Sequence, residues 1–121
     1  MTASRLDIVT LNTPHTDELS KFWADLLGLQ EIEREDGDRW ILLWNSNGGR
    51  AIGFQRGDHV DGSIHIDLSC STSDFPNERE RILRLGAVET RPMRSEPYGL
   101  IANFADVDGN LFDLCAYVSA D

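Results

Sequence analysis

Three side chains give this sequence its clearest capacity for chemistry: His65, Asp67 and Asp113. His65 and Asp67 stand two positions apart in an alternating segment, and side chains at that spacing point to the same face of a β-strand. Asp113 lies in a second alternating segment, residues 110–117. A histidine beside carboxylates can act as a general base, with one carboxylate orienting its ring. The same residues also suit a plainer role, in which His65 is a strand residue satisfied by a hydrogen bond to an aspartate.

This group offers a weak metal site at best. A catalytic transition-metal site usually has about three protein ligands and one open position. His65 and Asp113 supply two ligands, and Asp67 becomes a third only if its strand bends. We therefore expect no cofactor, and we expect His65 and Asp113 to be the ligands if a divalent metal does bind.

Two tryptophans, Trp40 and Trp44, share one face of the strongly apolar segment 39–45 with Leu42. This face is either a cavity wall or the side that packs on a helix. Beside carboxylates, the two indole rings would suit a flat or cationic ligand, because the faces of aromatic rings attract cations.

The elements that position these residues come from an internal repeat. Residues 6–29 and 64–87 both have an alternating strand, a polar turn and an amphipathic helix that ends in Leu-Gly, and aligning Gly28 with Gly86 gives an offset of 58 residues. Further strand patterns follow each helix, including one predicted at 87–92. The sequence therefore predicts an α+β fold of two βαβββ modules, 1–57 and 62–121, joined by a linker at about 57–62.

Composition excludes several function classes. The chain has 121 residues, with 11 basic against 21 acidic residues and a formal net charge of −10. This charge repels phosphate backbones, so we expect no nucleic-acid partner; it favours a cationic ligand or simply keeps the protein in solution. No apolar run approaches the ~18 residues of a membrane span, and we expect a cytoplasmic protein with reduced cysteines, Cys70 and Cys115.

The sequence lacks the motifs of several other chemistries. The sequence has no nucleotide-binding glycine pattern and no G-x-S-x-G nucleophile motif. The string Asp106-Val107-Asp108-Gly109 is too short for a calcium-binding EF-hand loop, and Asp-Gly between alternating segments predicts a hairpin turn.

Three segments carry a resemblance to a known family: FWADLLGL at 22–29, HIDL at 65–68 and FADVDGNLFDL at 104–114. With the strand-helix repeat, they resemble the vicinal oxygen chelate superfamily, and most of all its small bacterial glyoxalase-like domain proteins. This superfamily includes glyoxalase I, extradiol dioxygenases, fosfomycin-resistance enzymes and bleomycin-binding proteins. The resemblance covers residues 5–117 and implies a single glyoxalase-like domain, a cavity between curved mixed sheets and a homodimer.

The resemblance also implies where a metal would bind, on the first, fourth, fifth and last strands. Carried over, these positions fall on Ile8, on Gly53 or Gln55, on His65 and on Asp113. Ile8 and Gly53 offer no ligand atom, so the set is broken. We expect the implied cavity to be lined by Ile8, Thr10, Gln55, His65, Asp67, Asp113 and Cys115, with Trp40 and Trp44 as further ligand-binding candidates.

Two functions follow as expectations. The first is a protein of the glyoxalase/bleomycin-resistance type that binds a small aromatic or cationic molecule without a complete metal site. The second is a lyase, isomerase or dioxygenase of the same superfamily, with catalytic residues His65, Asp67 and Asp113.

Overall fold

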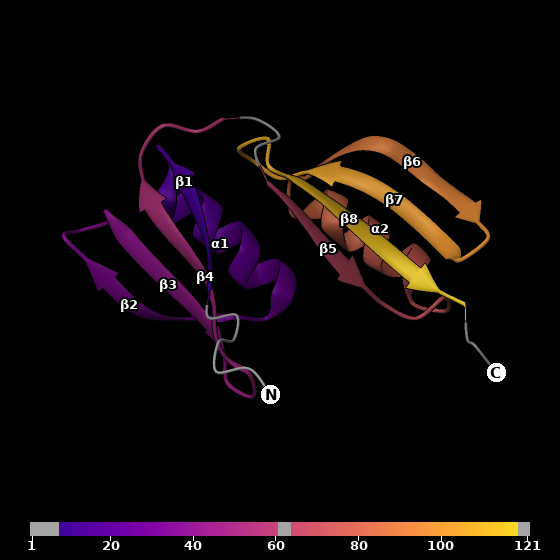
Figure 1. Ribbon diagram of the computed structural model, residues 1–121, viewed down its shortest axis with the longest axis horizontal. Coiled ribbons are helices and arrows are strands. Elements are labelled where there is room, and N and C mark those ends of the chain that lie inside the picture. Colours follow the sequence, from indigo (N-terminus) through magenta and orange to yellow (C-terminus); the bar gives the residue numbers. More distant parts are fainter. Residues whose placement is uncertain (1–7, 61–63, 119–121) are drawn as a thin grey trace, which may run out of the picture. The chain divides into compact units, whose positions relative to one another are not determined.

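The computed structural model describes residues 8–60 and 64–118. The chain divides into two compact units, Met1–His59 and Val60–Asp121, which we call the first and second modules. Within the described residues, each module has one helix and one four-stranded sheet (Figure 1). The linker predicted at 57–62 falls at the division between the modules and lies partly outside the described residues.

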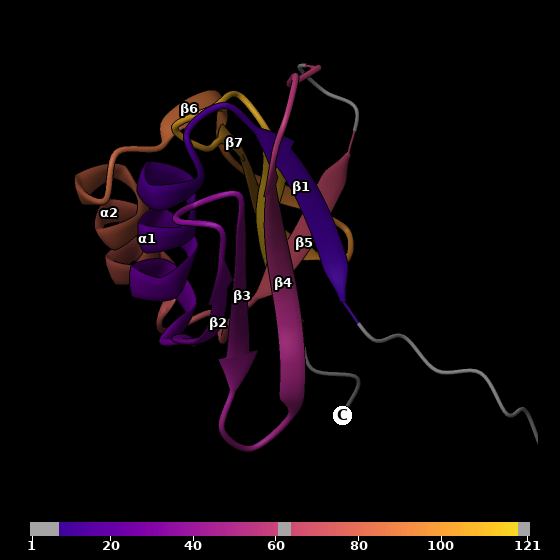
Figure 2. The ribbon, with the colours of Figure 1, turned by 90° about the vertical axis from the view of Figure 1, so that its left-hand side faces the viewer.

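The first module follows the predicted βαβββ order. Its sheet has the strand order β1-β4-β3-β2, in which β1 is parallel to β4 and the other pairs are antiparallel. The helix α1 ends at Gly28, whose left-handed backbone (φ 67°) suits a residue without a side chain. Figure 2 shows α1 lying on one side of this sheet. The elements are β1 (Val9–Thr13), α1 (Thr16–Leu27), β2 (Gln30–Glu35), β3 (Trp40–Asn45) and β4 (Gly49–Arg56).

The second module repeats this topology. Its strand order is β5-β8-β7-β6, again with one parallel pair, β5 with β8, which corresponds to β1 with β4. The predicted strand at 87–92 is longer in the structure, because β6 continues to Glu96 through two irregularities. The elements are β5 (His65–Ser69), α2 (Phe75–Arg84), β6 (Val88–Glu96), β7 (Gly99–Ala105) and β8 (Leu111–Tyr117). The α+β fold of two βαβββ modules is thus confirmed.

Each helix buries an apolar stripe against its sheet. In α2, Phe75 and Ile82 are fully buried, as are Phe104 of β7 and Phe112 of β8. The rings of Phe104 and Phe112 stack with their centroids 5.4 Å apart. Residues that alternate with these aromatic side chains must point to the opposite face, so the helix and its core determine which face of the sheet is available for binding.

The turn between β7 and β8 is a closed hydrogen-bonded unit. The carboxylate of Asp106 accepts hydrogen bonds from the backbone N–H groups of Asp108 and Asn110 and from the side-chain amide of Asn110. Both Asp106 and Asn110 are buried. The predicted hairpin turn is confirmed, and the turn sets the register in which β8 returns along β7. Neither described helix is long and apolar enough to cross a membrane.

Candidate functional site

A row of polar side chains crosses the sheet of the second module on the face opposite α2. Strand pairing places Asp67 of β5 beside Asp113 of β8, Asp113 beside Asn103 of β7, and Asn103 beside Arg91 of β6. These four residues, the polar row, point away from α2 because Phe112, the neighbour of Asp113 in β8, belongs to the helix-side core. Four adjacent strands therefore each contribute one polar group to the same surface.

Asp113 is the centre of this row and is held from both sides. Its Oδ2 lies 2.6 Å from Nε2 of His65, and its Oδ1 accepts a hydrogen bond of 2.5 Å from Nδ2 of Asn103. The side chain of Asp113 is only 12% exposed, whereas that of His65 is 54% exposed. A nearly buried carboxylate needs such partners, because an unpaired buried charge would be costly. Asp113 is thus a rigid acceptor on which the imidazole of His65 is oriented.

The hydrogen bond to Asp113 raises the pKa of His65 above its ordinary value, and it outweighs the opposing effect of partial burial. The negative charges of Asp113 and Asp67 act in the same direction. Because a carboxylate can only accept, Nε2 of His65 carries a proton in this pair. No hydrogen bond to Nδ1 is found in the described part of the chain, so this atom can accept from a ligand when the ring is neutral or donate when it is charged.

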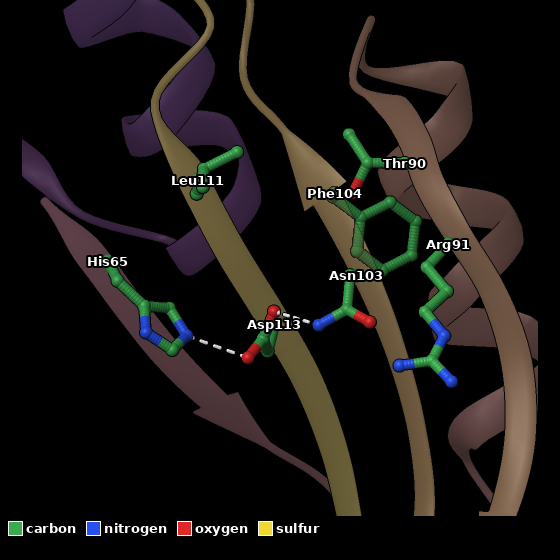
Figure 3. A pocket seen from close by; sticks show the side chains of 7 residues that line it. All are labelled: His65, Thr90, Arg91, Asn103, Phe104, Leu111 and Asp113. Carbon is green, nitrogen blue, oxygen red and sulfur yellow. Dashed lines mark hydrogen bonds and ion pairs between the residues drawn. The ribbon is translucent and has the colours of Figure 1, made fainter. Parts of the chain in front are cut away.

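A pocket of about 350 Å³ opens beside this hydrogen-bonded group. This volume is at the lower end of the range for small-molecule sites, about 300–1,000 Å³. Figure 3 shows His65 and Asp113 on one side, Arg91 on the other, and Asn103 between them. All the lining residues belong to the second module: His65, Thr90, Arg91, Asn103, Phe104, Leu111 and Asp113.

His65, Asp67 and Asp113 meet as the sequence suggested, with ligand atoms all within 4.8 Å of one another. Nε2 of His65 lies 3.2 Å from Oδ1 of Asp67 as well as 2.6 Å from Asp113. Nε2 is therefore engaged with the carboxylates, and Nδ1 is the ring nitrogen left to bind a metal. These residues fit a three-ligand site at most.

One of the two fourth-strand metal positions implied by the resemblance, Gly53, is covered by another side chain of the protein. A Cβ atom at Gly53 would lie 2.3 Å from Cη2 of Trp40, so the indole ring rests directly on the glycine backbone. The ring is also held by a hydrogen bond of 3.4 Å from its Nε1 to Glu33. The four-ligand set of the family's metalloenzymes therefore does not fit this chain. Ile8 has no ligand atom, Gly53 has neither a ligand atom nor space for one, and the alternative position, Gln55, has no carboxylate.

The remaining candidates of the first module form a separate group. Pairing places Thr10 beside Gly53 and Gln55 beside Trp40, so these side chains share one face. This face is opposite α1. Leu43, which alternates with the residues of this face in β3, points to the other side of the sheet, where it lines a surface hollow together with residues of α1.

Trp44 lies at a bulge in the pairing of β3 with β4 and is half-buried. Its buried Nε1 has no hydrogen-bond partner among the described residues.

Cys115 shares the polar-row face but is almost completely buried, and it is not part of the pocket lining. Burial raises the pKa of its thiol, which keeps the group protonated and unreactive at neutral pH. Its position matches a small core residue. A ligand-binding role for Cys115, as for the candidates of the first module, stays a prediction.

Thr90 and Arg91 were not identified from the sequence, and Asn103 was not singled out. Asn103 is separated from Asp113 by a turn, and only the pairing of β7 with β8 brings them together. Thr90 and Arg91 are consecutive residues, which in a regular strand would point to opposite faces. The signal for them would have been the loss of alternation in VETRPMRSE, residues 88–96.

Comparison with known proteins agrees with this architecture. Residues 8–115 match the family described as glyoxalase-like domain. An uncharacterised protein of Shewanella frigidimarina is 30% identical over 111 residues, which cover 81% of this chain and 82% of that protein.

Solved structures show the same fold. A glyoxalase/bleomycin resistance protein/dioxygenase family enzyme from Burkholderia phytofirmans has a TM-score of 0.80 at 16% identity, covering 95% of this chain and 100% of its own. The fosfomycin resistance protein FosX from Listeria monocytogenes, solved with Mn(II) and sulfate, has a TM-score of 0.77 at 22% identity, covering 98% and 93%. The chain therefore belongs to the glyoxalase-like domain family.

Proposed function

We propose that this glyoxalase-like protein binds a small organic molecule in the pocket of its second module, without a complete metal site. The observation that carries the proposal is the hydrogen-bonded group of His65, Asp113 and Asn103 beside a pocket of about 350 Å³. The buried carboxylate holds both partners in place before any ligand arrives. Preorganised polar groups reduce the ordering cost of binding and determine the orientation of a ligand.

The pocket supplies apolar contact as well as polar groups. Leu111 is 39% exposed and forms one wall, next to the ring of His65. An exposed leucine beside oriented hydrogen-bonding groups suits a ligand with an aromatic ring and at least one polar substituent. Small size follows from the volume of the pocket.

The test is a screen of small aromatic compounds by NMR, observing the backbone and imidazole signals of ¹⁵N-labelled protein. Leu111→Trp would fill the pocket from its apolar wall and should abolish binding. Met93→Trp is the matched control, because Met93 is 48% exposed and lies on the helix side of β6, beside Pro92. The proposal fails if ligands that bind the wild-type protein bind Leu111→Trp equally well.

A second function, catalysis by a lyase, isomerase or dioxygenase, is favoured by one observation: the contact between His65 and Asp113 is a histidine-carboxylate pair of the kind used in acid-base catalysis. FosX of similar fold holds Mn(II), so a metal-dependent form of this alternative also needs a test.

Two measurements separate these functions. Metal content after purification without chelators, followed by titration with Mn²⁺, Ni²⁺ and Zn²⁺, tests the metal. Tight stoichiometric metal that is lost in His65→Ala would contradict the metal-free proposal. Turnover of a bound compound that disappears in His65→Ala, in a protein shown to hold no metal, would establish metal-free catalysis.

A further inference from the structure

We propose that the ligand of this pocket is an organic acid whose carboxylate pairs with Arg91. The inference rests on the proposed binding function and deepens it by naming the chemical class of the ligand. Arg91 lines the pocket opposite His65, as Figure 3 shows. Across residues 8–60 and 64–118, no hydrogen bond or ion pair to its guanidinium is found.

Most of the described arginines have an acidic partner, and Arg91 shares the lack of one with Arg84, which is exposed on α2. The net charge is −10 with 21 acidic residues, so carboxylates greatly outnumber the available cations. Nearby arginines are paired: Arg79 binds Glu89 through two nitrogens, and Arg94 lies 3.4 Å from Glu96. Arg91 is exposed into a pocket and is left with its full set of donors.

The backbone of β6 is distorted at this point. The pairing of β6 with β7 shifts by one residue between Glu89 and Arg91 and again between Arg91 and Arg94. Bulges of this kind interrupt the ladder of hydrogen bonds and redirect side chains. Here they allow the consecutive residues Thr90 and Arg91 both to line the pocket. The regular pairing of β6 with β7 is thus interrupted at the position where the Arg91 guanidinium lines the pocket.

The other charges of the pocket do not compete for Arg91. Both oxygens of Asp113 already accept hydrogen bonds, one from His65 and one from Asn103. His65 lies on the far wall and is held by its hydrogen bond to Asp113. A ligand carboxylate can therefore accept two parallel hydrogen bonds from the Arg91 guanidinium, the bidentate geometry that arginine favours.

The net charge of the chain favours a cationic ligand, but salt screens most of that charge from the pocket because the charged groups are distant from it. At physiological ionic strength, exposed charges beyond about 8 Å are largely screened. The electrostatic interactions of the ligand are therefore mainly with the residues that line the pocket. Among these residues, Arg91 is the charged group without a partner. The long-range negative field lowers the affinity for an acid uniformly without changing which group Arg91 prefers.

The experiment compares three probes that share one ring and differ in charge: benzoate, benzamide and benzylammonium. Each is titrated into ¹⁵N-labelled protein while the signals of His65, Asn103 and Leu111 are observed. Benzoate should bind about five- to tenfold more tightly than benzamide, the ratio expected for one charge-assisted pair at a partly exposed site. Benzylammonium should bind most weakly.

Arg91→Gln should remove the preference for benzoate and leave the affinity for benzamide unchanged. Arg84→Gln is the matched control, because it removes the same charge from an exposed residue of α2 and should leave the preference intact. Unchanged spectra away from β6 would show that Arg91→Gln is folded.

The outcomes distinguish the two proposals. If benzamide or benzylammonium binds at least as well as benzoate, or if Arg91→Gln and Arg84→Gln bind benzoate equally, the carboxylate assignment is wrong and the binding function stands. If none of the probes moves the pocket signals, both proposals fail.

Discussion

Replacing Gly53 by alanine tests whether the indole of Trp40 occupies the position that the family's metalloenzymes use for a ligand. The new Cβ would lie 2.3, 2.9 and 3.0 Å from three ring atoms of Trp40. Carbon atoms in contact are about 3.5–4.0 Å apart, so the ring or the strand must move by roughly 1 Å. Overpacking of this size costs about 1–3 kcal/mol, and we expect Gly53→Ala to lower the free energy of unfolding by that amount.

A double-mutant cycle identifies the cause. In a Trp40→Leu background the obstructing ring is absent, and the alanine should be neutral or should stabilise β4 by about 0.5 kcal/mol, because glycine is unfavourable inside a strand. The two substitutions should therefore couple by at least about 1 kcal/mol. Urea unfolding of all four proteins is followed by far-UV circular dichroism and by tryptophan fluorescence, since the fully buried Trp23 and also Trp44 remain in each protein.

Gly57→Ala is the matched control just beyond the end of β4. A Cβ at Gly57 would lie 3.9 Å from Asn12, an ordinary contact, so this substitution should change stability by less than about 0.5 kcal/mol. The proposed position of the indole is wrong if Gly53→Ala is as stable as the wild-type protein. It is equally wrong if the effects of Gly53→Ala and Trp40→Leu simply add.

Three further predictions concern the second module. The pKa of His65 is raised above the ordinary 6.5 in the folded protein, so its stabilising effect should be complete below pH 6.5 and should disappear as pH rises through the folded-state pKa. Because the His65 side chain is 54% exposed, this effect should be about 1 kcal/mol or less; urea unfolding between pH 6 and 9 measures it, and Asp113→Asn should remove it. Asn103→Ala should lower the free energy of unfolding by about 1–3 kcal/mol, because it leaves one oxygen of a buried carboxylate without a donor; an equally stable variant would show that water replaces the amide. Asp106→Ala removes three hydrogen bonds from the β7–β8 turn and should cost about 2 kcal/mol, with faster amide exchange at Asn110, whereas unchanged exchange would contradict the role assigned to the turn.

Much of the fold follows from local patterns in the sequence. The period of two in a strand places His65 and Asp67 on one face, and the apolar spacing of a helix produces α1 and α2. The repeat of this unit predicted both βαβββ modules, and the Asp-Gly pair predicted the β7–β8 turn. These features depend on neighbours in the chain, so the local sequence is sufficient to predict them.

The composition of the pocket depends on strand pairing instead. His65 and Asp113 are 48 residues apart and meet because β5 pairs with β8 in one particular register. Asn103 joins them through the register of β7 with β8. A shift of either register by one residue would turn these side chains to the helix side, and no short segment of sequence specifies that choice.

The sequence by itself determined the duplicated architecture and the identity of the histidine and carboxylates that are capable of chemistry. Only the tertiary structure decided that Asp113 is held by Asn103, that two bulges direct Arg91 into the pocket, and that the ring of Trp40 fills the space at Gly53. The physical reason is the range of the interactions. Alternation and capping act within a few residues, whereas register, bulges and close packing are set by contacts between strands distant in the chain.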